Sequence, residues 1–284
     1  MHRQIVAALL LTCAPQAVAA PALEQFTWVP DDPDIGGLSA IEVADNGADF
    51  LALSDRGLFV SGSLVRDDSG RIVDVQAAGT TSIDVLPNAA EGRAAKDSEG
   101  LAIAPHGTIY VAFEGAHRVS AFDSVTATER PLPAHPDFQT MQNNSSLEAL
   151  AIDQSGALYT LPERTGRYDR PFPIYRFVDG AWSIAMRLPR DGSFLAVGAD
   201  FGPDGWLYIL ERDFTGISFR NQVRRVNLDT ARAEIVLPPR KTFGNLEGIS
   251  VWTDANGDVR VTMISDDNYH FLLQTQIIEF RLGG

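Results

Sequence analysis

Acidic side chains recur at the ends of short apolar segments, and this placement is the first sign of chemistry in the chain. One group stands at the start of such a segment and consists of Glu99, Glu148 and Glu247. A second group stands at the end of the following apolar segment and consists of Asp55, Glu114, Glu163, Glu211 and Asp266. Carboxylates that lie close together repel one another unless a cation neutralises them. Oxygen ligands without thiols favour Ca²⁺ or Mg²⁺ over zinc.

Arginine directly follows three of these acids. The pairs are Asp55-Arg56, Glu163-Arg164 and Glu211-Arg212. A planar guanidinium binds a carboxylate or a phosphate through two parallel hydrogen bonds, so these three arginines are candidates for binding an anionic substrate group. The alternative is that each pair is a salt bridge with a purely structural role. Counted from the preceding turn glycine, Glu211 is one residue out of register, and Arg212 takes the place that Glu114 has in its own segment.

The candidate bases for hydrolysis are Glu211, Glu163 and His270. A carboxylate beside a bound cation can activate water against an ester or phosphoester. The candidate metal ligands are Glu99, Glu148, Glu247, Asp55 and Asp266, and the expected cofactor is Ca²⁺. The chain contains no G-x-S-x-G elbow, no H-E-x-x-H motif and no Cys/His zinc set.

Composition limits the possible partners. The chain has 284 residues, 45% of them hydrophobic and 21% charged, with a formal net charge of -14. A chain of this size can bury a substantial core, and its apolar content excludes global disorder. The excess of acids argues against a nucleic-acid or anionic-membrane partner, since both require a basic face.

The first twenty residues are typical of a secretory signal peptide. An apolar run over residues 5–12 is too short to span a bilayer, and small residues then offer a cleavage site. Cys13 leaves open a lipoprotein anchor instead. We predict that residues 1–20 are removed and that residues 21–284 form a single domain in the bacterial periplasm or outside the cell. Because this cleavage removes the sole cysteine, the mature chain can form no disulfide.

The rest of the chain reads as short strands separated by turns. β-branched and aromatic segments alternate with Asn-Gly, Asp-Gly and similar pairs that are typical of tight hairpins. Five stretches resemble one another, each with an apolar strand and most with a glycine turn after it: residues 36–43, 99–107, 148–156, 197–205 and 247–257. A spacing of ~50 residues is typical of one four-stranded propeller blade.

These repeats predict an all-β fold, a β-propeller of five four-stranded blades. The last repeat lacks an outer strand, and residues 23–29 offer one; their pairing would close the ring and remove a free edge. The first gap is longer than the others, so residues 58–96 leave room for a sixth blade. A β-sandwich is the remaining alternative, but it predicts no fixed period.

Propeller geometry brings the acids together. The start of the innermost strand and the end of the next strand lie on the same face, near the axis. We therefore expect about eight carboxylates to converge on one axial mouth, with arginines between them. Gly36 and Val197 occupy the matching places in the two repeats that lack a glutamate.

Several motifs together are similar to a known family. They are GGLSAI (36–41), LSDRG (53–57), DSEGLAI (97–103), NSSLEALA (144–151), LYILERDF (207–214), NLEGISVW (245–252) and ISDDN (264–268). In this order they resemble the phytase-like, "esterase-like activity of phytase" family of exported bacterial β-propellers. The resemblance implies a propeller, export, and hydrolysis of an ester or phosphoester with calcium. It carries over the following matching positions without roles: Glu99, Glu148, Glu247, Asp55, Glu211, Arg212 and Asp266. Ala149 and Val197 depart from the motif, so a regular ring of acids is not implied.

The leading hypothesis is an exported, Ca²⁺-assisted hydrolase that acts as a monomer on a small anionic ester or phosphoester. It has no nucleic-acid partner and, once the signal peptide is removed, no membrane partner. One alternative is a non-catalytic propeller that binds a ligand or protein and uses calcium for stability. Another is a lactonase-like propeller that acts on a cyclic ester.

Overall fold

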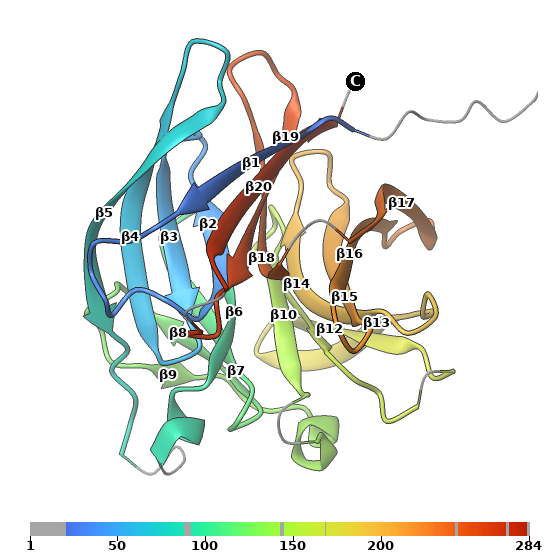
Figure 1. Cartoon of the computed structure of the whole chain (residues 1–284). Coiled ribbons are helices and arrows are strands. Elements are labelled where there is room, and N and C mark those ends of the chain that lie inside the picture. The colour runs from blue at the N-terminus through green and yellow to red at the C-terminus, as the bar shows by residue number, and fades with distance from the viewer. Residues whose placement is uncertain are drawn as a thin grey trace, which may run out of the picture.

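The fold is a ring of five antiparallel sheets, and this confirms the predicted five-bladed β-propeller. The computed structural model describes residues 21–87, 92–142, 145–167, 169–241, 244–270 and 273–282. The predicted signal peptide, residues 1–20, lies outside the described residues. Figure 1 shows the sheets arranged around a common axis. No helix in the described part of the chain is long and apolar enough to span a membrane.

Each blade contains four strands. Blade 1 consists of β2 (Leu38–Val43), β3 (Asp49–Ser54), β4 (Leu58–Arg66) and β5 (Ile72–Ser82). Blade 2 consists of β6 (Ser98–Ile103), β7 (Ile109–Phe113), β8 (Arg118–Phe122) and β9 (Arg130–Pro131). Blade 3 consists of β10 (Leu147–Ile152), β11 (Leu158–Pro162), β12 (Phe172–Val178) and β13 (Ala181–Leu188). Blade 4 consists of β14 (Leu195–Phe201), β15 (Leu207–Phe214), β16 (Phe219–Asn227) and β17 (Arg232–Arg240).

Blade 5 is built from both ends of the described chain. It consists of β18 (Asn245–Thr253), β19 (Val259–Asp266), β20 (Thr275–Leu282) and β1 (Leu23–Trp28). β1 pairs with β20 in antiparallel register, and the two lie side by side in Figure 1. The predicted closure by an N-terminal strand is therefore confirmed. The longer first gap holds β4, β5 and the 3₁₀-helix η1 (Gly92–Ala95), not a sixth blade.

The innermost strands β2, β6, β10, β14 and β18 contact one another around the axis. This close packing requires small residues near the start of each inner strand. A Cβ atom added to Gly100 would lie 2.6 Å from the carbonyl oxygen of Glu148, and one added to Gly248 would lie 2.8 Å from the Cα of Ala40. The small residue that follows the first position of each repeat is thus a packing requirement of the ring.

The core lies between neighbouring blades. Blades 1 and 2, for example, share a cluster that includes Leu53, Phe59, Val111 and Phe122, all of which are almost completely withdrawn from water. The rings of Phe59 and Phe122 meet edge to face, with their centroids 5.8 Å apart. These apolar layers fix the blades relative to one another and so hold the axial ends of the strands in place.

Candidate functional site

The innermost strand of every blade carries a β-bulge near its start. The pairing register skips one residue in each blade, and the skipped residues are Ser39, Glu99, Glu148, Val197 and Glu247. A bulge re-aims its side chain relative to the rest of the strand, which explains how three glutamates reach the axis. The predicted alignment of blade 1 was wrong, because Ser39 and not Gly36 is the equivalent of these glutamates. The Ser39 hydroxyl donates to the carbonyl of Ser98 at 2.8 Å.

A second ring of side chains lies at the end of the second strand of each blade, opposite the residue two places before the bulge. Its members are Asp55, Glu114, Glu163, Arg212 and Asp266. Blade 4 therefore contributes Arg212 where the other blades contribute an acid. Leu195 pairs with Arg212, and Ala196 pairs with Glu211, so the one-residue slip seen in the sequence is real.

The acidic members of the two rings, except Glu163, line a cavity of about 510 Å³ at one end of the axis. Its acidic lining consists of Asp55, Asp97, Glu99, Glu114, Glu148, Glu247 and Asp266. All five residues that the sequence suggested as metal ligands line this cavity. The suggested set omitted Asp97 and Glu114. Asp97 stands two residues before Glu99, a spacing that puts both side chains on one side of an extended segment, so the sequence did hold a signal for it.

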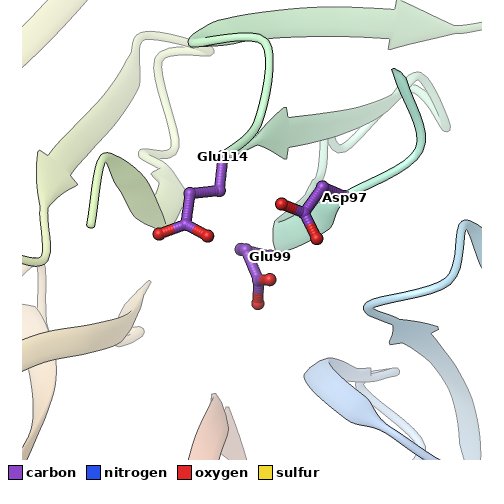
Figure 2. A group of neighbouring side chains, drawn as sticks. All are labelled: Asp97, Glu99 and Glu114. Atoms are coloured by element: carbon purple, nitrogen blue, oxygen red, sulfur yellow. The ribbon is translucent and has the colours of Figure 1, made fainter. Parts of the chain in front are cut away.

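Three of these acids form a tight group. Asp97, Glu99 and Glu114 each offer a carboxylate oxygen, and these oxygens all lie within 4.8 Å of one another. Figure 2 shows the three side chains beside one another, with Asp97 just before β6, Glu99 within β6 and Glu114 just after β7. A donor set made only of carboxylate oxygens fits a hard divalent cation such as Ca²⁺.

Electrostatics make these carboxylates reluctant to ionise together. Burial raises the pKa of Glu99 well above its usual range, and the charge of Glu247 raises it further. Burial also raises the pKa of Glu114 to about 7, with a contribution from the charge of Asp97. Asp266 is affected in the same way, since burial and neighbouring carboxylates raise its pKa to about 8. A bound cation would remove much of this cost.

Arg212 pairs with Glu247, one of the lining carboxylates, and with Glu163. Its Nη1 donates to the side chains of Asn245, at 2.5 Å, and Glu247, and its Nη2 donates to Glu163 at 3.2 Å. Burial lowers the pKa of Arg212, but Glu247, Glu148 and Glu163 outweigh this effect and hold it above its usual range. Because both terminal nitrogens serve the chain's own acceptors, the predicted role of Arg212 in binding a substrate anion is not supported.

The two other candidate arginines, Arg56 and Arg164, are not among the residues that line this cavity. Arg56 is exposed, and its guanidinium stacks on the ring of Tyr269 with 3.2 Å to the ring centroid. The side chain of Arg164 is 53% exposed, and its Nε donates to Glu163 at 3.1 Å. Each follows a residue of the second ring directly in sequence and has surface open to a ligand, and Arg164 lines a separate cavity of about 380 Å³.

The structure argues against the three predicted bases. Glu211 is completely buried inside blade 4, where Arg224 binds both of its oxygens and Gln222 donates to it at 2.7 Å. Glu163 is buried, and it forms ion pairs with both Arg164 and Arg212. His270 is exposed on the loop after β19 and is not among the residues that line the cavity. The adjacent pair Glu211-Arg212 misled the prediction because only its arginine faces the axis.

A second cavity, of about 700 Å³, lies at the opposite end of the inner strands. Its lining includes Glu42 and Asp200 among apolar side chains such as Phe50 and Trp252. Burial raises the pKa of Glu42 well above its usual range, and the charge of Asp200 adds to this. Burial raises the pKa of Asp200 to about 7, although its carboxylate accepts hydrogen bonds from the backbone N–H groups of Val251 and Phe201.

This pair predicts a pH-dependent effect of Glu42→Gln. A carboxyl with a raised pKa in the folded state favours folding most below its unfolded pKa, about 4, and this advantage is lost as the pH rises toward the folded value. Removing one of the two acids should therefore raise the melting temperature by about 3–6 °C at pH 8.5. Near pH 4 the variant and the parent should melt within about 1 °C of each other. Melting curves at both pH values check this, with the exposed Asp68→Asn as control. An equal shift at both pH values would contradict it.

Comparisons with known proteins identify one family. A family model described as "Phytase-like: Esterase-like activity of phytase" matches residues 33–269. No curated protein matches the chain. A virginiamycin B lyase structure from Staphylococcus aureus is similar at 12% identity and a TM-score of 0.48, covering 92% of this chain and 99% of the lyase. A streptogramin B lyase structure is similar at 13% identity and a TM-score of 0.44, covering 90% of this chain and 97% of the lyase.

Proposed function

The chain belongs to the phytase-like family, and from that premise we propose that it is an exported hydrolase of a small anionic ester or phosphoester, assisted by Ca²⁺. The observation that carries the proposal is the group formed by Asp97, Glu99 and Glu114 in the axial cavity. The clustered oxygen donors and the raised pKa values of Glu99 and Glu114 both favour occupation by a hard divalent cation.

In this proposal Asp97, Glu99 and Glu114 hold the cation. When bound, the cation supplies positive charge that neutralises and polarises the anionic ester group. Arg56 and Arg164, each next in sequence to a residue of the second ring, bind the anionic group of the approaching substrate through their exposed guanidinium surfaces.

Proton transfer falls to acids outside this group. Asp266 lines the same cavity outside the group of Asp97, Glu99 and Glu114, and burial together with neighbouring carboxylates raises its pKa to about 8, which favours its protonated form. In the proposed reaction Asp266 gives its proton to the leaving-group oxygen as the bond to that oxygen breaks. Glu148, also in the lining, has a pKa that burial raises and the charge of Arg212 lowers; a bound cation would lower it further, and in the proposed reaction its carboxylate accepts the proton that the attacking water releases. Glu148 takes up one proton from water and Asp266 gives one to the leaving group, so the protons balance. The products are an alcohol and either a carboxylic acid, from an ester, or a phosphate, from a phosphoester.

The direct test is hydrolysis of aryl esters, aryl phosphates and phytate by the purified mature chain, with Ca²⁺ and with EGTA. We expect turnover only in Ca²⁺. Turnover that is indifferent to chelation would overturn the metal-assisted mechanism. A panel of lactones is assayed as well. If the protein binds the cation but hydrolyses none of these compounds, the non-catalytic binding propeller is favoured. Turnover on lactones alone would favour the lactonase-like alternative.

Asp266→Asn tests the role of the proton donor. A nitrophenolate leaves without protonation, so hydrolysis of a nitrophenyl substrate should change little. An alkoxide requires a proton, so hydrolysis of the matched alkyl substrate should fall by about 100-fold. Asp68→Asn, an exposed acid far along blade 1, serves as the control and should leave both rates unchanged. Equal losses on the two substrates would remove Asp266 from this role.

A further inference from the structure

The cavity of about 380 Å³ that Arg164 lines belongs to blade 3 and shares no lining residue with the axial cavity. Residues of the 3₁₀-helix η2 (Pro136–Thr140), the loop after β11, β12 and β13 surround it. Among the described residues, the charged members of its lining are Arg164, Arg170, Arg187 and Asp137, three cations and one anion. This local excess of positive charge contrasts with the formal net charge of -14 for the whole chain.

Contacts within the protein hold both walls of this cavity in place. The ring of Phe138 in η2 meets the ring of Tyr175 edge to face, with 5.1 Å between the centroids, and both residues are buried. On the other side, the hydroxyl of Thr165 donates to the backbone carbonyl of Arg170 at 2.8 Å and so holds the loop after β11 together. The cavity is therefore formed before any ligand enters it, as is usual for sites that bind small molecules.

Two of the three arginines are not neutralised by an acid. Over the described ranges of the chain, neither Arg170 nor Arg187 forms an ion pair, and both residues are exposed. Asp and Glu number 37 against 23 Lys and Arg, so carboxylate partners are plentiful in this protein. Arg164 is paired with Glu163 through Nε, but its side chain is 53% exposed. Three guanidiniums with free surface thus border one preformed cavity.

The charge of Arg187 acts toward the inside of this cavity. Burial and the neighbouring Asp137 raise the pKa of Tyr175 above its usual range, and the positive charge of Arg187 acts in the opposite direction. The Tyr175 hydroxyl donates to the carboxylate of Asp137 at 2.9 Å, so this acid already has a hydrogen-bond partner. Three prolines also line the cavity and have no backbone N–H to donate, so the guanidiniums supply its charged donors.

We propose that this cavity binds a small molecule that carries a phosphate or carboxylate group, with Arg170 and Arg187 on that group and Arg164 beside them. A planar guanidinium binds either group through two parallel hydrogen bonds. Met141 and the three prolines offer an apolar surface to the rest of the molecule. The proposed hydrolysis uses neither Arg170 nor Arg187, so the two proposals can fail separately.

Calorimetric titration of the purified protein with phenylphosphonate and with benzoate, both in EGTA, tests the inference. Without a cation the axial cavity is lined by carboxylates and repels anions, so binding under these conditions reports on blade 3. We expect a single equivalent to bind, and the tighter of the two ligands shows whether the recognised group is phosphate-like or a carboxylate. If neither anion binds, the inference is overturned, whether or not the protein is a hydrolase.

Variants locate the bound anion. Arg170→Gln and Arg187→Gln should each weaken its binding by about 10-fold, since each removes charge-assisted hydrogen bonds. Asp137→Asn should strengthen binding by about 3-fold, because it removes the acid from the lining and keeps an oxygen that can accept from Tyr175.

Arg71→Gln is the matched control, because Arg71 is an exposed arginine of blade 1 and should leave the affinity unchanged. Melting curves show that each variant is folded. Unchanged affinity in both Arg170→Gln and Arg187→Gln would overturn the inference, and so would an equal loss in Arg71→Gln.

Discussion

Glu99→Gln is expected to weaken Ca²⁺ binding by about 100-fold or more, because it removes one charged ligand of the three in the blade 2 group. The same change should raise the melting temperature of the protein in EGTA. Glu99 is the acid on which the charges of Glu247, Glu114, Asp97 and Asp55 all act, so its neutral amide relieves repulsion that the folded state otherwise carries. One substitution should therefore stabilise the cation-free protein and abolish stabilisation by Ca²⁺.

Glu247→Gln is the control for this experiment. Glu247 lines the same cavity but is bound to Arg212, so its replacement should disturb the arginine and leave calcium affinity within several-fold of the parent. Calorimetric titration and melting curves with Ca²⁺ and with EGTA measure both effects. If Glu247→Gln lost the cation and Glu99→Gln kept it, the cation would lie on the Arg212 side and the assignment to blade 2 would be wrong.

Glu211→Ala is expected to destabilise the fold by about 3–5 kcal/mol, which corresponds to a fall in melting temperature of roughly 10 °C. The alanine leaves Arg224, a residue only 7% exposed, without the carboxylate that binds it through two nitrogens. Gln222 loses its acceptor as well. Turnover per folded molecule at ambient temperature should be close to that of the parent, because Glu211 does not reach the axial cavity.

The double variant Glu211→Leu/Arg224→Met is the control to compare with Glu211→Ala. It removes both charges, so it should recover a large part of the stability that Glu211→Ala loses. Thermal melting and turnover, measured on the same preparations, separate the two roles that the sequence left open for Glu211. A variant that melts like the parent but has lost turnover would return Glu211 to the list of candidate bases.

Much of the fold could be predicted because it repeats. The apolar strand, the glycine turn and the spacing of ~50 residues recur, and each copy meets the same packing demand at the axis. Closure by residues 23–29 followed from counting strands, since the last blade otherwise lacked one. The convergence of Glu99, Glu148 and Glu247 on one cavity followed from the repeat together with the general geometry of a propeller.

The direction of individual side chains could not be predicted with the same success. Asp55-Arg56, Glu163-Arg164 and Glu211-Arg212 look alike in the sequence, yet in the first two the acid faces the axis and in the third the arginine does. Neighbouring residues of a strand point to opposite sides. A slip of one residue in the pairing register therefore moves a side chain from the axial side into the interior of the blade, and its neighbour the other way. The slip depends on the pairing register of β14 with β15, which is set by contacts between strands and leaves only a faint local signal.

The pairing of β1 with β20 also determines the order in which the ring can be completed. Leu23 lies opposite Phe280, so β1 has to wait until β20 has been synthesised before it has its partner. Contacts this distant in sequence are formed late and slowly. Until β1 docks, β20 presents an unprotected edge on which the first strand of a second chain would fit equally well. The same seam that closes one ring could thus, at high concentration during refolding, join two chains through exchanged strands.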